Sequence, residues 1–183
     1  MFTLQHCKTG LAIAAMVATS GAFAATGNRA DHSAAKDRIS AEYKADKAAC
    51  DAHSGNQKDI CVEQAKGKEK VAMAEAEYNY TGKPADANKI AVEKADATYA
   101  VAKEMCDDKA GNAKDVCVTE AKATHKKSLA DAKMTKKVGE ARKDAAEDRR
   151  EADYKVATEK CDSLAGDAKS ACVSAAKSKF GKT

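Results

Sequence analysis

Six cysteines, in three pairs with the same internal spacing, are the residues of this chain most suited to chemistry. Within each pair, ten residues separate the two cysteines, and a valine follows the second. Such a pair can form a disulfide, bind a soft metal through its thiolates, or exchange disulfides with another protein. The three pairs are Cys50 and Cys61, Cys106 and Cys117, and Cys161 and Cys172.

The spacing within each pair favours a disulfide over the two other kinds of chemistry. Zinc sites usually draw on cysteines two to four residues apart, and the chain has no Cys-x-x-Cys motif. Closing a loop of this size is worth roughly 3 kcal/mol of chain entropy. We therefore expect a disulfide within each pair and no metal or other cofactor. Copper or zinc binding by reduced thiols, or small-ligand binding, is the alternative.

The cysteine pairs belong to a unit that recurs with a period of about 55 residues, which is typical of a tandem array. In each copy a glycine follows the first cysteine by five residues, and an Asn or Asp that can cap a helix comes next. These signals predict that one helix ends at the glycine and another starts directly after it, with Asp59 and Asp115 completing a capping box. The residues concerned are Gly55, Gly111 and Gly166, followed by Asn56, Asn112 and Asp167.

The composition predicts an all-α fold with a weak core. Alanine supplies most of the apolar side chains, and Pro84 is the only proline. Alanine is the best helix former, but its burial removes little apolar surface from water. We therefore expect three tandem disulfide-stapled helical hairpins, arranged as an extended array or a loose bundle.

Three tyrosines repeat with the cysteines, each seven residues before the first cysteine of its copy. This spacing places each tyrosine on the same helix face as the cysteine, two turns away. We interpret them as core residues whose hydroxyl groups reach solvent, with a ligand-stacking ladder as the alternative. They are Tyr43, Tyr99 and Tyr154.

The N-terminal segment has the pattern of a secretory signal peptide. A basic residue, Lys8, precedes the apolar run 11–18, and small residues then lead to a cleavage site after Ala24. The run is shorter than the ~20 residues that span a bilayer, so we expect no transmembrane anchor after cleavage. Residues 1–24 are the predicted signal peptide. The mature protein would be periplasmic or secreted, with Ala25 to about Asp31 disordered, and Cys7 would leave with the signal.

The predicted domains are three hairpins, at residues 25–80, 81–138 and 139–183. Gly82 and Pro84 must break the helix at the first boundary. The second boundary has only Gly139, so a continuous or kinked helix is possible there. We expect the first hairpin to behave most independently, and the second and third to be coupled.

The charge pattern and the motifs exclude several functions. The 32 basic and 28 acidic residues are interleaved along the chain, which indicates a solvated helix surface and no nucleic-acid partner. Phosphate-binding loops, nucleophile elbows and zinc-protease motifs are absent from the sequence, so we expect no enzyme and no catalytic residue. The histidines His32, His53 and His125 fall at non-equivalent positions and do not form a repeated site.

With its Lys-, Ala-, Glu- and Asp-rich helices and Cys-Asp-x-x-x-Gly units, the chain resembles a group of helical proteins exported by Gram-negative bacteria. In composition alone it also resembles the helical stalk of the Tol envelope system, which lacks such cysteines. The resemblance implies a periplasmic setting and no particular activity. We expect a structural, spacer or interaction role with a protein or envelope partner. A chaperone-like cradle would need an exposed apolar concave face.

Overall fold

The computed structural model describes residues 28–182, and every regular element in that range is helical. The all-α prediction is therefore confirmed. The predicted signal peptide, residues 1–24, lies outside the described residues. The elements are α1 (Arg29–Ala49), the single 3-10 turn η1 (Cys50–Ala52), α2 (Gly55–Thr81), α3 (Pro84–Asp107), α4 (Gly111–Cys161) and α5 (Gly166–Phe180).

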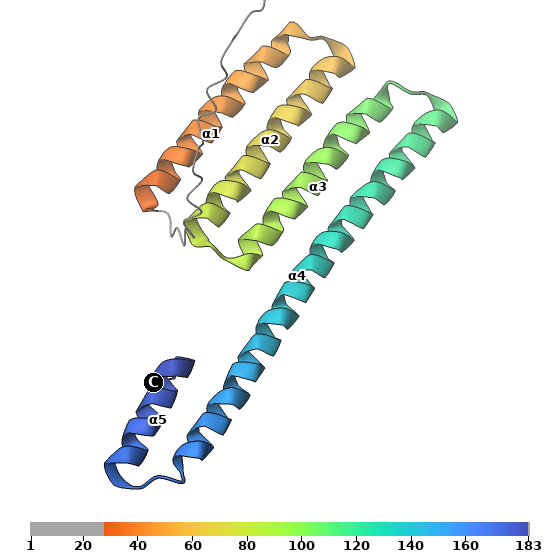
Figure 1. Ribbon diagram of the computed structural model, residues 1–183. Helices are drawn as coiled ribbons and strands as arrows, with labels where there is room; N and C mark the ends of the chain where they lie inside the picture. Colours follow the sequence, from red (N-terminus) through yellow and green to blue (C-terminus); the bar gives the residue numbers. More distant parts are fainter. Residues whose placement is uncertain (1–27, 183) are drawn as a thin grey trace, which may run out of the picture.

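The helices form an extended array. Among the described residues, each helix packs only against its neighbours in chain order. Figure 1 shows α1, α2, α3 and the first half of α4 side by side in one layer, while the rest of α4 projects beyond it and carries α5. We call these two parts the four-helix layer and the C-terminal hairpin. Of the two arrangements expected, the structure has the extended array.

The turn between α2 and α3 breaks the helix as predicted. Gly82 ends α2 in the left-handed region, with φ of 63°, and its amide donates to the carbonyl of Tyr78 at 2.7 Å. Pro84 then starts α3, where its missing amide hydrogen is no loss. The chain reverses at this point, so α3 runs back along α2.

The expectation that the first hairpin is the most independent is wrong. The contact between α2 and α3 is the most extensive of all helix pairs, because the turn folds the second hairpin against the first. Gly67 lies so close to α3 that an added Cβ would stand 2.6 Å from the Cβ of Ala97. The break at Gly82 and Pro84 therefore joins the first two hairpins instead of uncoupling them.

The C-terminal hairpin is the separate one, because α4 continues without a break through Gly139. The boundary expected between residues 138 and 139 falls inside this helix. Helix α4 has 51 residues, which corresponds to about 75 Å at 1.5 Å per residue. Without a proline or a left-handed glycine at this point, the second and third hairpins share one straight helix instead of folding together.

The core is thin and lies along the seams between helices, as expected from an alanine-rich chain. Ile39 is the only large aliphatic side chain among the buried residues of the described range. Ion pairs on the surface add to the seam between α1 and α2. There the Nζ of Lys68 lies 2.6 Å from Glu42 and 2.9 Å from Asp46, and hydrogen bonds to Glu42 and Asp46 raise its pKa to about 12. The other buried apolar residues are Cys50, Ala65, Ala74, Ala95, Cys106, Ala132, Cys161 and Ala176.

The start of α1 corrects the expected disorder up to about Asp31. Asn28 caps the helix, and its Oδ1 accepts hydrogen bonds from the amides of Ala30 at 2.6 Å and Asp31 at 3.1 Å. Asparagine is among the best N-cap residues, so the helix begins at Arg29.

Candidate functional site

All six cysteines form the three expected disulfides, each within its own unit. The Cα atoms are 5.6 Å apart in Cys50–Cys61, 5.6 Å in Cys106–Cys117 and 5.7 Å in Cys161–Cys172. The first cysteine of each pair has an exposed fraction of 0–1%, whereas the second is half-buried. Each disulfide thus lies on the inner side of its hairpin, where it holds two antiparallel helices together next to their turn.

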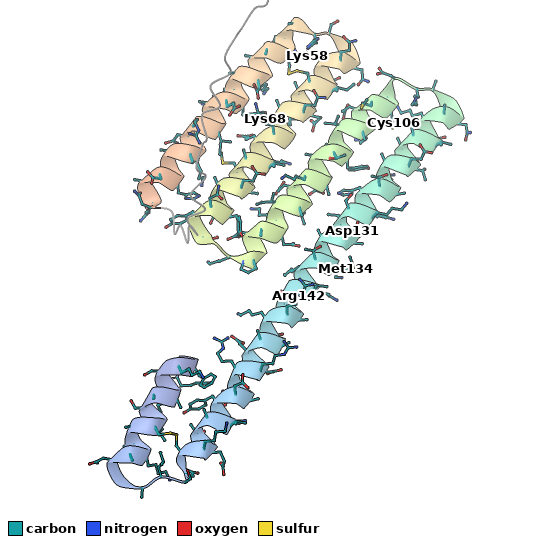
Figure 2. The ribbon with its side chains drawn as sticks, in the orientation of Figure 1. Lys58, Lys68, Cys106, Asp131, Met134 and Arg142 are labelled. Atoms are coloured by element: carbon teal, nitrogen blue, oxygen red, sulfur yellow. A yellow bond between two sulfur atoms is a disulfide. The ribbon has the colours of Figure 1, made fainter. Side chains whose placement is uncertain are left out.

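An ion pair across the turn accompanies each disulfide, and sequence reasoning missed it. The aspartate after the first cysteine meets a lysine seven residues further on, with N–O distances of 2.8, 2.9 and 3.0 Å. Hydrogen bonds from Lys58 and Lys114 lower the pKa of Asp51 and Asp107, respectively. The signal was present, since both residues recur in all three copies. The pairs are Asp51–Lys58, Asp107–Lys114 and Asp162–Lys169, and Figure 2 labels Lys58.

The glycine in each turn is left-handed as expected, but it begins the second helix instead of ending the first. The φ angles of Gly55, Gly111 and Gly166 are 55°, 53° and 56°. No side chain caps α2, α4 or α5, so the expected capping roles of Asn56, Asn112 and Asp167 and the capping box of Asp59 and Asp115 are wrong. In these turns the preceding residue is extended, and the helix begins with the glycine itself.

The side chain of Asn56 has a different role. Its Nδ2 donates to the backbone carbonyl of Glu104 at 2.8 Å, from the start of α2 to the end of α3. This bond links the turn of the first hairpin to the second hairpin. It therefore adds to the close packing of α2 on α3.

Two of the repeated tyrosines contact rings from the facing helix, one by stacking and one edge to face, and all three are half-buried. The ring centroids of Tyr99 and His125 are 4.7 Å apart, and those of Tyr154 and Phe180 are 6.1 Å apart. His125 also lies 2.5 Å from Asp96 through its Nε2. These contacts support the interpretation of the tyrosines as core residues over the ligand-stacking ladder.

The histidines differ in their surroundings, but one of them does occupy a repeated position. His125 and Phe180 each follow the first cysteine of their unit by 19 residues. The positions of the histidines alone do not show this repeat, because the equivalent residue is a phenylalanine. His32 stacks on Tyr80 with centroids 4.5 Å apart, and its Nε2 is 3.1 Å from Glu77 without the alignment of a hydrogen bond. His53 lies exposed in the first turn. The rings thus act as contacts between neighbouring helices.

The part of the chain that the structure describes offers little support for a metal-binding site. No group of three or more His, Cys, Asp or Glu side chains there could hold a metal ion. Because all six cysteines are in S–S bonds, metal binding by thiols would first require their reduction.

The middle of α4 is the other unusual feature. All 18 residues from 133 to 150 are exposed, although they lie within one continuous helix. A helix that is polar on most sides typically bridges two parts of a structure. Here charged side chains of both signs are interspersed, and Lys136 lies 3.8 Å from Glu140 one turn away. This segment separates the four-helix layer from the C-terminal hairpin by about 27 Å along the helix.

A comparison of the chain with protein-family models, curated proteins and solved structures finds no match. Between residues 28 and 182, no helix is long and apolar enough to cross a membrane. Three disulfides are typical of proteins located outside the cytoplasm.

Proposed function

We propose that this chain is a non-enzymatic periplasmic protein that acts as a structural spacer in the cell envelope. One observation carries the proposal, namely that a fully exposed stretch of helix, residues 133–150, connects two disulfide-stapled ends. A rigid helix keeps a fixed distance between its ends, whereas a flexible linker does not. The four-helix layer and the C-terminal hairpin are then the two parts that engage protein or envelope partners.

The stapled ends support this role because a spacer must keep its ends folded while they are exposed on most sides. With few buried side chains, the hairpins depend on their disulfides, and such bonds persist only in an oxidising compartment. The predicted signal peptide and the resemblance to exported Gram-negative proteins favour the periplasm.

Exposed apolar side chains at the two ends are suitable places to look for partners. Met105 near the end of α3 is 54% exposed, and Leu164 in the last turn is 42% exposed. A photoreactive amino acid placed at either position in the source cells should capture a protein if that end engages one. Ala146, in the exposed stretch of α4, is the control position.

The spacer role predicts adducts from both ends and none with another protein from Ala146. Adducts from one end only would indicate a protein that binds a partner through that end and does not act as a spacer. Adducts from neither end would contradict the proposal.

A further inference from the structure

Helix α4 has an apolar face that no other described part of the chain covers. Four of its large apolar residues are exposed, to 47% for Val116, 59% for Met134, 44% for Val138 and 54% for Val156. Their spacing places all four on one side of the helix, and together they extend along almost its whole length. We call this side the apolar stripe. It also contains the exposed alanines Ala123, Ala130, Ala141, Ala145 and Ala152.

The apolar stripe lies opposite the contacts that α4 makes within the chain. His125 faces α3, and Tyr154 faces α5, as their ring contacts show. Both residues lie about half a turn away from the stripe at 3.6 residues per turn. In Figure 1, α3 and α5 lie on the same side of α4, and the other side is free along the helix. Figure 2 labels Met134 where α4 passes the start of α3.

The internal repeat indicates what covers this face. Helices α2 and α3, with 27 and 24 residues, correspond to the two halves of α4, with its 51 residues. Relative to the cysteines, Ala123 corresponds to Gly67 and Ala152 to Ala97. Gly67 and Ala97 form a close contact between α2 and α3. In α4 the equivalent positions lie on one straight helix and cannot meet within the chain.

We propose that the apolar stripe of α4 pairs antiparallel with the same stripe of a second copy. Ala123 of each copy then contacts Ala152 of the partner, which repeats the packing of α2 on α3 twice around a two-fold axis. Because α3 and α5 lie on the other side of α4, they leave room for the second helix. Alanine in place of Gly67 sets the two α4 helices slightly further apart than α2 and α3.

Charge complementarity supports this pairing. One turn from the Ala123–Ala152 contact, Lys127 lies opposite Asp148 of the partner, and both residues are exposed within the chain. The corresponding residues of α2 and α3 are Val71 and Glu93, which are not oppositely charged. The dimer contains two Lys127–Asp148 pairs because of its symmetry.

The same register brings further apolar residues together. Two turns from the first contact, Ala130 lies opposite Ala145, and after three turns Met134 lies opposite Ala141. Small residues let the two backbones approach closely, while Met134 fills the space near the axis. The inference rests on the stripe and the repeat, and it is independent of the spacer role.

Sedimentation equilibrium of the oxidised mature protein, combined with a charge exchange, tests the proposal. Wild-type protein should reach the mass of a dimer as its concentration rises. Lys127→Glu and Asp148→Lys should each weaken the dimer by about tenfold, because each places two pairs of like charges in contact. The double variant K127E/D148K should restore it. Lys143→Glu, on the opposite side of α4, is the matched control and should leave the dimer unchanged.

Three results would overturn the proposal. A monomer at every concentration would show that no second copy binds. The protein could also be a monomer that each single substitution destabilises and the double variant restores. This result would show that α4 folds back on itself near Gly139. A dimer that is insensitive to the exchange would place the contact on another surface.

Discussion

Tyr99 and His125 stack face to face between α3 and α4, with ring centroids 4.7 Å apart and planes inclined by 13°. Tyr154 and Phe180 occupy the equivalent positions in the C-terminal hairpin, where the rings meet edge to face. An acidic residue precedes each tyrosine by three positions, and it binds His125 in one hairpin and Lys182 in the other. A ring contact and a charged contact therefore recur with different residues.

Replacing His125 should separate these two contributions. His125→Ala removes both the stacked ring and the bond to Asp96, and should lower the free energy of unfolding by about 1–2 kcal/mol. His125→Phe restores a ring, as in the C-terminal hairpin, and should recover at least part of this loss. Urea denaturation at neutral pH measures both variants. Equal destabilisation by alanine and phenylalanine would mean that stacking contributes nothing.

The two glycines in helix interiors should respond in opposite ways to alanine. Gly67→Ala places a methyl group 2.6 Å from the Cβ of Ala97, and should lower stability by about 1–3 kcal/mol despite the better helix propensity. Gly139→Ala meets nothing within 4 Å, and should stabilise the protein by up to about 1 kcal/mol. Thermal and urea unfolding of both variants checks the pair. A stabilising Gly67→Ala would contradict the close packing of α2 on α3.

Removing single disulfides should reveal which hairpins are coupled. Loss of Cys161–Cys172 by double serine substitution should increase hydrogen exchange in α5 and the end of α4, and leave the four-helix layer protected. Loss of Cys50–Cys61, worth roughly 3 kcal/mol, should also increase exchange in α3, which packs against α2. Hydrogen exchange with mass spectrometry resolves the helices. If all hairpins opened together, the array would be one cooperative unit.

The turn ion pairs should respond to acid. Hydrogen bonding to Lys114 lowers the pKa of Asp107, so this contact stabilises the folded state above the unfolded pKa of about 3.9. Its contribution is lost as the pH falls through the lower folded value. Carboxyl NMR titration of Lys114→Met should show the pKa of Asp107 returning towards its ordinary value. Lys109→Met, in the same turn, is the control. An unchanged titration in Lys114→Met would refute the ion pair.

Much of the fold could be predicted because its signals are local. The cysteine spacing predicts the disulfides, and the glycine and proline at Gly82 and Pro84 predict a turn. The packing of α2 on α3 could not be read in the same way, because it depends on Gly67 meeting Ala97 across 30 positions of sequence. A helix break in the sequence indicates a loss of coupling, whereas in the fold it brings these two residues together.

The remaining differences also come from contacts between helices. The Asp107–Lys114 pair recurs in the sequence, but its partners become neighbours only when the turn has formed. The position of Asn56 next to a helix start predicts a capping role, but its side chain donates to the carbonyl of Glu104 in the next hairpin instead. The helix through Gly139 stays continuous because glycine alone weakens a helix by only about 1 kcal/mol.

The distance between the two ends of α4 tests the central claim most directly. Spin labels carried by unnatural amino acids at Ala113 and Glu159 report this distance by pulsed electron paramagnetic resonance. Dilution with excess unlabelled protein ensures that the signal arises within one copy. An uninterrupted helix predicts a narrow distribution near about 70 Å, from 1.5 Å per residue. A main distance near about 10 Å, the spacing of packed helices, would show that α4 folds back like α2 and α3, and would contradict the account.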